Sequence, residues 1–214
     1  MTALTDRLAW GLIPAVPVPF RGTEIALDAQ ERCARWMAEQ EIAGVAVWAH
    51  TGRGPHLSPG ERRAVLAAWR AALPDRVIVA GADSVEMARE ARAGGADALL
   101  AFPCRDDPVT YHAALARELP VIAFYLYDAA GGVPYDDRTL RAILRLGGVI
   151  GVKVATLDSV VTFQRLATVV RDFPGKLLIT GEDRFLGYSL ILGARAALVG
   201  MGGVHPDLQV RLLR

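Results

Sequence analysis

Eight short apolar runs recur along this chain, and their spacing constrains the fold more than any other feature. The runs are rich in Val, Ile and Ala, and longer segments that carry Arg and Glu at helical spacing separate them. This alternation is typical of βα units around a parallel sheet. Eight parallel strands favour a (β/α)8 barrel, in which reactive groups stand at the C-terminal ends of the strands. The predicted strands are Leu12–Val18, Gly44–Trp48, Val77–Ala80, Ala98–Phe102, Val121–Tyr125, Gly151–Val154, Leu177–Thr180 and Ala197–Met201.

Capping residues mark the helices expected between these strands. Gly94-Gly95 ends the third helix, and only residues 202–214 follow the last strand, which is enough for about two turns at ~3.6 residues per turn. We therefore expect one barrel domain over residues 1–214, with its eighth outer helix truncated or missing. The predicted N-caps are Asp28, Ser58, Ser84, Asp107 and Ser159.

A doubly wound open sheet is the main alternative to the barrel. Its dinucleotide-binding form gains no support, because no Gly-x-Gly-x-x-Gly follows a strand near the start of the chain.

Composition narrows the classes of partner. The 24 basic and 23 acidic residues are spread along the chain and leave a formal charge of +1, which argues against nucleic acid or a membrane surface as a partner. Cys33 and Cys104 have no metal-ligand spacing, and we expect no metal. The start lacks the pattern of a signal peptide, and charges interrupt every apolar stretch. We expect a cytoplasmic protein that binds a small molecule.

Lys153 stands inside the apolar run of the sixth predicted strand. Near the C-terminal end of a barrel strand, an inward amine loses solvation, its pKa falls, and it can attack a carbonyl to form a Schiff base. The alternative is a lysine that extends from the strand end into solvent.

Several motifs, in order and at matching spacing, resemble the dihydrodipicolinate synthase and N-acetylneuraminate lyase family of class I aldolases. The resemblance implies a (β/α)8 barrel in which Lys153 forms a Schiff base with a 2-oxo acid, usually pyruvate. No organic cofactor is implied, because the imine itself is the electron sink. The matching segments are Gly11–Phe20, Leu57-Ser-Pro-Gly-Glu-Arg62, Gly94–Ala98, Pro120–Tyr125, Ile150-Gly-Val-Lys153, Thr180-Gly-Glu-Asp183 and Leu192–Arg195.

The second loop departs from the family pattern Gly-Thr-Thr-Gly-Glu. Here it reads Ala49-His-Thr-Gly-Arg53, in which Thr51 and the turn amides of Thr51 and Gly52 can still bind a carboxylate. His50 replaces a threonine of the proton relay; it either transfers protons itself or is structural. Arg53 attracts an acidic substrate or lies in solvent.

The fifth strand also departs from the family, whose members end it Tyr-Asn-x-Pro with the tyrosine as proton shuttle. The matching residue is Phe124, which cannot move a proton. Because a strand alternates faces, Tyr125 reaches the lumen and acts in catalysis only if a bulge shifts the register; otherwise it packs outward. In Gly181-Glu-Asp183, Gly181 is expected to line the substrate site, whereas Glu182 and Asp183 either line it or cap the next helix.

These observations predict a lyase or aldolase that takes a pyruvate-like 2-oxo acid and an aldehyde. A catalytically silent relative that binds an oxo acid or a protein partner is the second hypothesis. A sugar-phosphate enzyme is the third, since Gly200-Met-Gly-Gly203 could hold phosphate. The short stretch after the eighth strand leaves apolar strand faces uncovered, so we expect a homo-oligomer.

Overall fold

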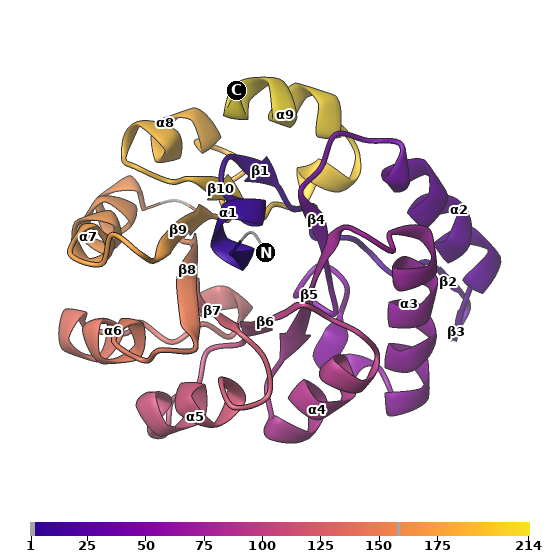
Figure 1. Ribbon diagram of the computed structural model, residues 1–214, viewed down its shortest axis with the longest axis horizontal. Coiled ribbons are helices and arrows are strands. Elements are labelled where there is room, and N and C mark those ends of the chain that lie inside the picture. The colour runs from indigo at the N-terminus through magenta and orange to yellow at the C-terminus, as the bar shows by residue number, and fades with distance from the viewer. Residues whose placement is uncertain (1–2, 158) are drawn as a thin grey trace.

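The chain folds as a barrel of eight parallel strands ringed by helices (Figure 1), as expected from the sequence. The computed structural model describes residues 3–157 and 159–214. The ring closes between the first and second barrel strands, where Ala46 N–H donates to Pro14 O at 2.8 Å and Val16 N–H donates to Ala46 O at 3.1 Å. In hydrogen-bonding order the strands are β1 (Gly11–Leu12), β10 (Ala196–Ala197), β9 (Leu177–Thr180), β8 (Val149–Ala155), β7 (Val121–Leu126), β6 (Ala98–Ala101), β5 (Val77–Ala82) and β4 (Gly44–Val47).

The first and last barrel strands are shorter than predicted, and β10 ends at Ala197 rather than at Met201, which begins the 3-10 turn η3 (Met201–Gly203). Pro14 and Pro17 have no N–H to continue the ladder, so only Gly11–Leu12 pair regularly and Ala15 forms an isolated bridge to Ala46. An antiparallel hairpin of β2 (Phe20–Arg21) and β3 (Glu24–Ile25) follows outside the barrel, and the sequence analysis did not predict it.

Capping chemistry sets where the helices begin. Ser58, Ser84, Asp107 and Ser159 each accept the N–H three residues on, as predicted. Asp28 is not a cap: the helix begins at Leu27, and the Asp28 carboxylate pairs with arginines instead. The helices are α1 (Leu4–Leu8), α2 (Leu27–Ala38), α3 (Pro59–Ala72), α4 (Val85–Ala93), α5 (Pro108–Leu115), α6 (Asp137–Leu144), α7 (Val160–Arg171), α8 (Leu186–Ile191) and α9 (Pro206–Leu213), with 3-10 turns η1 (Gly54–His56), η2 (Asp128–Ala130) and η3 (Met201–Gly203).

Of the two alternatives expected for the eighth outer helix, truncated or missing, the structure shows a short helix, the eight-residue α9.

Two apolar cores lie on opposite sides of the sheet because strand residues alternate in direction. On β7, Ile122, Phe124 and Leu126 fill the lumen, whereas Ala123 and Tyr125 join the core between sheet and helices. The short helix α1 lies at the centre of the ring in Figure 1, and its Leu8 packs into the lumen core. The N-terminal end of the barrel is thus closed, which leaves the C-terminal end for a site.

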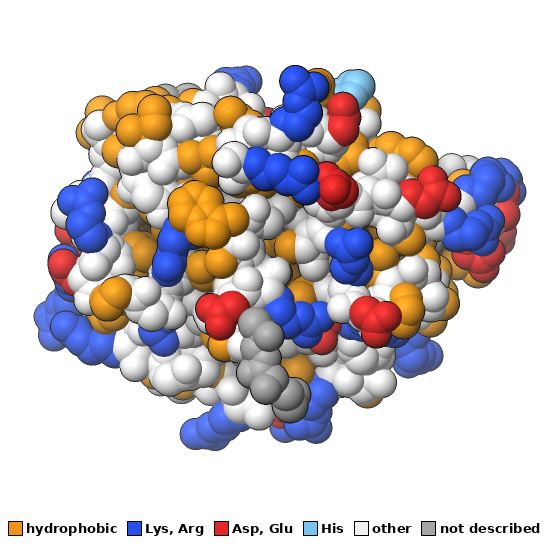
Figure 2. Space-filling model, turned by 45° about the horizontal axis from the view of Figure 1, so that its top comes forward, with side chains coloured by type: hydrophobic (Ala, Val, Ile, Leu, Met, Phe, Trp, Pro, Cys, Tyr) orange, Lys and Arg blue, Asp and Glu red, His pale blue; other side chains and the backbone are white. Residues whose placement is uncertain are grey.

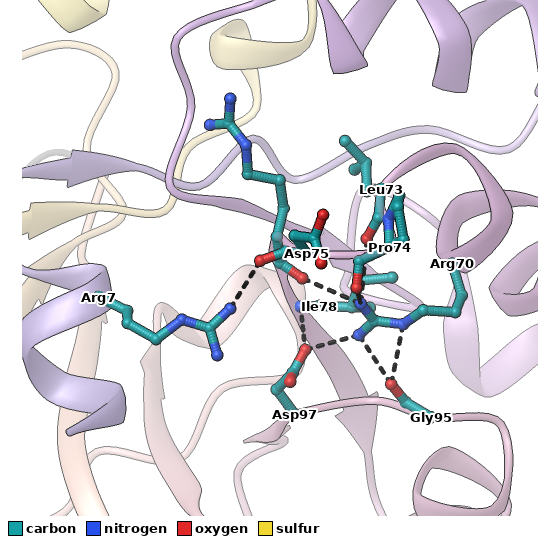
Figure 3. A network of polar contacts seen from close by, with 9 residues as sticks. Arg7, Arg70, Leu73, Pro74, Asp75, Ile78, Gly95 and Asp97 are labelled. Carbon is teal, nitrogen blue, oxygen red and sulfur yellow. Dashed lines mark hydrogen bonds and ion pairs between the residues drawn. The ribbon is translucent and has the colours of Figure 1, made fainter. Parts of the chain in front are cut away.

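Arg70 of α3 ties the closed end together (Figure 3). Its guanidinium donates to the Asp97 carboxylate at 2.6 Å and to Gly95 O at 2.7 Å, and it also reaches the carbonyl oxygens of Leu73, Pro74 and Arg76. Asp97 in turn accepts Ile78 N–H at 2.8 Å. The guanidinium of Arg70 therefore has a structural role.

Charges of both signs are interspersed on the face shown in Figure 2. Within residues 3–157 and 159–214, no helix is both long enough and apolar enough to cross a bilayer.

Candidate active site

Lys153 points into the lumen near the C-terminal end of β8. It pairs with Phe124 of β7 and Ile179 of β9, both of which belong to the lumen core. The residue is only 6% exposed, and its Nζ lies 4.1 Å from the centroid of the Phe124 ring. The lysine therefore does not extend into solvent, and its amine lies over an aromatic face.

Burial lowers the pKa of Lys153 from 10.5 to about 7, because the apolar lumen disfavours the ammonium form. Asp183 and Glu182 oppose this lowering from a distance. In the described part of the chain, no carboxylate oxygen pairs with this amine within 4.0 Å. A large share of the amine is consequently neutral, and nucleophilic, near neutral pH.

Gly181, directly after β9, makes room for the lysine. A Cβ at this position would lie 2.7 Å from Lys153 Cε and 2.9 Å from Ala155 Cβ. Only a glycine therefore lets the strand end approach the amine so closely. The structure thus brings two of the predicted site residues into contact.

Glu182 is buried, with 1% of its surface exposed, and it holds the loop after β8. Its carboxylate accepts the backbone N–H and the hydroxyl of Thr156, and the N–H of Leu157 at 3.1 Å. Leu157 adopts a left-handed φ of 63°, an unfavourable conformation for leucine that these bonds support. Glu182 does not cap α8, whose N-cap is Phe185.

The loop after β4 carries His50, Thr51 and Gly52 to the same end of the barrel. His50 and Thr51 are exposed, and Gly52 is buried. A Cβ on Gly200 would lie 3.8 Å from Thr51 Oγ1 and 3.6 Å from Asp183 Oδ2, so these two side chains flank one point at the barrel mouth.

No three His, Cys, Asp or Glu side chains among the described residues are grouped to hold a metal ion.

Comparison with known proteins finds relatives of this chain among synthases and lyases. No family model matches the chain. A 4-hydroxy-tetrahydrodipicolinate synthase from Parasynechococcus marenigrum (strain WH8102) is 30% identical over 219 aligned positions, which cover 94% of this chain and 71% of that protein. The chain belongs to the dihydrodipicolinate synthase and N-acetylneuraminate lyase family.

Two further relatives match this chain over a smaller share of their length or with lower sequence identity than the P. marenigrum synthase. The synthase from Ruegeria pomeroyi is 30% identical over 188 residues, which cover 81% of this chain and 63% of that protein, so the chain spans less than two thirds of its length. The solved structure of a catalytic lysine mutant of Ruminococcus gnavus sialic acid aldolase matches 99% of this chain and 73% of that one, with a TM-score of 0.86 at 20% identity, which shows a shared fold.

Tyr125 lies outside the barrel lumen. This position corrects the expectation that Tyr125 is a catalytic residue. Its ring packs in the core between sheet and helices, and its hydroxyl accepts a hydrogen bond from Arg165 of α7 at 3.2 Å. A register irregularity does occur between β7 and β8, but the additional residue is Ile150 on β8. The alternation on β7 is therefore undisturbed, and Phe124 keeps the lumen position.

A pocket of about 370 Å³ opens at the mouth of the barrel. Its lining comes from the loop after β4, the end of β6 and η2 after β7: His50, Arg53, Pro55, His56, Phe102 and Ala130. The sequence analysis placed Phe102 only at the end of a strand, and it found no partner for His56. Only the loops' convergence in space brings these residues together.

Proposed function

We propose that this chain is a lyase or aldolase that forms a Schiff base between Lys153 and a 2-oxo acid such as pyruvate. The observation that carries the proposal is the buried Lys153 amine, with a pKa of about 7, at the C-terminal end of a barrel strand.

The neutral amine attacks the ketone carbon of the oxo acid, and loss of one water leaves an imine. Once protonated, this imine accepts the electron pair of the C3–C4 bond, one bond away from the imine carbon, while a base takes the proton of the C4 hydroxyl. The C3–C4 bond breaks, C2 and C3 become the enamine double bond, and C4 leaves as an aldehyde. In the reverse direction the enamine attacks an aldehyde. No cofactor is needed for either direction, because the imine nitrogen takes the electron pair.

Residues around the amine bind the carboxylate of the substrate, leave space for the imine carbon and transfer protons. The backbone amides of Thr51 and Gly52 and the Thr51 hydroxyl bind the carboxylate of the oxo acid. Gly181 leaves the space that the imine carbon must enter, beside Lys153 Cε. His50 is the proton relay in this proposal, since an imidazole both donates and accepts protons.

The relatives support this assignment. The R. gnavus protein is described as a sialic acid aldolase with a catalytic lysine, and it shares the barrel fold of this chain. The P. marenigrum relative is a synthase of the same family.

A catalytically silent, oxo-acid-binding relative is the second candidate. Phe124 occupies the lumen position beside Lys153, and the neighbouring tyrosine faces outward. One general acid–base group contributes about 10²–10⁴-fold to a rate. A chain without a working relay would form the imine and turn over very slowly.

Reductive trapping tests the proposal. The protein is incubated with pyruvate, the imine is reduced with borohydride, and the adduct is located by peptide mass spectrometry. We expect an adduct at Lys153 and none in Lys153→Ala. Absence of an adduct with pyruvate and with larger 2-oxo acids would refute the Schiff-base assignment. Turnover of a panel of pyruvate-derived aldols, in wild type and His50→Gln, then separates an active lyase from a silent relative.

A further inference from the structure

The pocket at the barrel mouth lies next to the reacting amine. Phe102 lines the pocket and packs against Phe124, with ring centroids 6.2 Å apart, and the Phe124 ring lies 4.1 Å from Lys153 Nζ. Two aromatic rings thus form a continuous apolar surface from the lysine to the pocket. A substrate held at Lys153 can extend along this surface into the pocket.

Among the described residues, the pocket lining carries basic side chains and no acidic ones. Arg53, His50 and His56 supply all of its ionisable groups. Arg53 and His56 also line a second pocket with Glu61, whose carboxylate accepts Ser58 N–H at 2.7 Å in the α3 capping box. Asp128 lines a different pocket with Tyr125 and Thr156.

Arg53 has no acidic partner among the described residues. Its guanidinium carbon lies 5.9 Å from the centroid of the Phe20 ring, which leaves the N–H donors of the guanidinium unpaired. Unlike the arginines that pair with carboxylates on the helix surfaces, Arg53 lines two pockets, this one and the one beside Phe20. An arginine presents its donors as a planar fork that matches a carboxylate or phosphate.

One tight turn carries the three basic side chains. Arg53 N–H donates to His50 O at 3.1 Å, and His56 N–H donates to Arg53 O at 2.8 Å. Arg53 itself has a left-handed φ of 54°, and a Cβ on Gly54 would lie 1.9 Å from Trp48 O. The turn is therefore packed directly onto the end of β4, and its geometry is set before any ligand arrives.

We propose that this pocket binds a second anionic group, a carboxylate or a phosphate, on the part of the substrate that lies away from the 2-oxo acid's own carboxylate. Arg53 is the principal contact, and His56 donates a further hydrogen bond. The inference deepens the proposed function and names its substrate class: compounds with an acidic group at each end.

Trapping with charged and uncharged oxo acids tests the inference. The probes are 2-oxoglutarate and 5-methyl-2-oxohexanoate, in which an isopropyl group replaces the distal carboxylate. A charge-assisted hydrogen bond corresponds to about tenfold or more in affinity. We expect wild type to form the Lys153 adduct at a half-saturating concentration about tenfold lower for 2-oxoglutarate than for the isopropyl analogue.

Arg53→Gln should abolish this difference, and Arg53→Lys should retain part of it. Arg63→Gln is the matched control, because Arg63 is exposed on α3 and does not line the pocket. Equal half-saturating concentrations for the two probes in wild type, or equal weakening of both by Arg53→Gln, would overturn the inference.

A second measurement separates this inference from the Schiff-base proposal. Lys153→Ala cannot form an imine, so succinate and inorganic phosphate are titrated into it separately while the imidazole resonances of His50 and His56 are followed by NMR. Saturable changes in these resonances that Arg53→Gln weakens about tenfold support the pocket even if no oxo acid is trapped, and the tighter probe identifies the group. No saturable change with either anion would overturn the inference.

Discussion

Lys153 and the residues that touch it set the chemistry proposed for this barrel. Burial in the apolar lumen disfavours the ammonium form, and Gly181 lets the neighbouring strand end approach the side chain. The same burial that prepares the amine for attack makes the lysine a cost to folding whenever it is charged. Reactivity and stability are therefore linked at this residue.

Replacing Lys153 with methionine should stabilise the protein in acid. Below pH 7 the lysine is protonated in both the folded and the unfolded chain, so the full cost of burying the charge is present. Between pH 7 and 10.5 the unfolded chain binds a proton that the folded chain does not, and stability rises with pH. At pH 6, the free energy of unfolding measured in urea should be a few kcal/mol larger for Lys153→Met than for wild type. Each unit by which a pKa is lowered corresponds to about 1.4 kcal/mol. The advantage should vanish near pH 10; an advantage independent of pH would contradict the lowered pKa.

Adding a methyl group at Gly181 should displace the amine. Gly181→Ala places a Cβ 2.7 Å from Lys153 Cε, 2.9 Å from Ala155 Cβ and 3.0 Å from Val154 O, so the lysine or the strand end must move. We expect the rate of pyruvate trapping to fall by about tenfold or more, as small displacements from reacting geometry do. Gly187→Ala is the control, since a Cβ there meets nothing within 4 Å. Equal trapping rates in both variants would contradict the contact.

Glu182 joins two elements of the barrel rather than acting locally. It follows β9, yet its carboxylate satisfies the backbone donors of Thr156 and Leu157 between β8 and α7. The position of that loop, and therefore of the open end beside Lys153, depends on this one buried acid. Glu182 is a positioning residue in this proposal.

Glu182→Gln should move the pH dependence of imine formation downward. The carboxylate favours the charged form of Lys153, so its removal lowers the pKa of the lysine below about 7. The midpoint of the trapping rate against pH reports the change. Glu24→Gln, at an exposed position in the β2–β3 hairpin, should leave the midpoint unchanged. An upward movement of the midpoint with Glu182→Gln would show that the carboxylate does not act on the lysine as proposed.

At the scale of the whole molecule, the two ends of the barrel have different tasks. The N-terminal end is closed by α1 and tied by Arg70, which links α3 to the turns before β5 and β6. The C-terminal end carries Lys153 and the basic pocket. Stability and proposed chemistry are thus separated along the barrel axis.

Arg70→Met should destabilise the fold without changing the trapping midpoint. The variant keeps the aliphatic stem but leaves Asp97 and several carbonyl oxygens without their donor, at a cost of about 2–4 kcal/mol. Urea unfolding measures the cost. Arg63→Met, on the exposed face of the same helix, should change stability by less than about 0.5 kcal/mol. A similar loss in both variants would contradict the role of the network.

Association is expected from the exposed apolar side chains around α9. Leu208 and Leu212 of that helix and Val204 just before it are each at least half exposed. Exposed apolar side chains that lie close together on a surface favour self-association. Light scattering should show an oligomer, and Leu208→Glu with Leu212→Glu should move it towards monomer. A monodisperse wild-type monomer would refute the expectation.

The sequence by itself determined the features that depend on neighbours along the chain. Apolar periodicity predicted the eight strands, and side chains that accept nearby N–H groups predicted four helix starts. The apolar run around Lys153 indicated either a buried amine or a lysine that extends into solvent, and the family resemblance favoured the buried amine. These signals are local because strand period and capping involve residues only a few positions apart.

Only the tertiary structure decided the features that depend on contacts across the barrel. Tyr125 could not be assigned a face until the irregularity between β7 and β8 was located on β8. Glu182 meets a loop 26 residues earlier in the chain, and Arg53 lines one pocket with Phe102 and Ala130 from two other parts of the barrel mouth. No local pattern encodes such contacts, because ring closure and loop packing bring distant residues together only after the strands have formed.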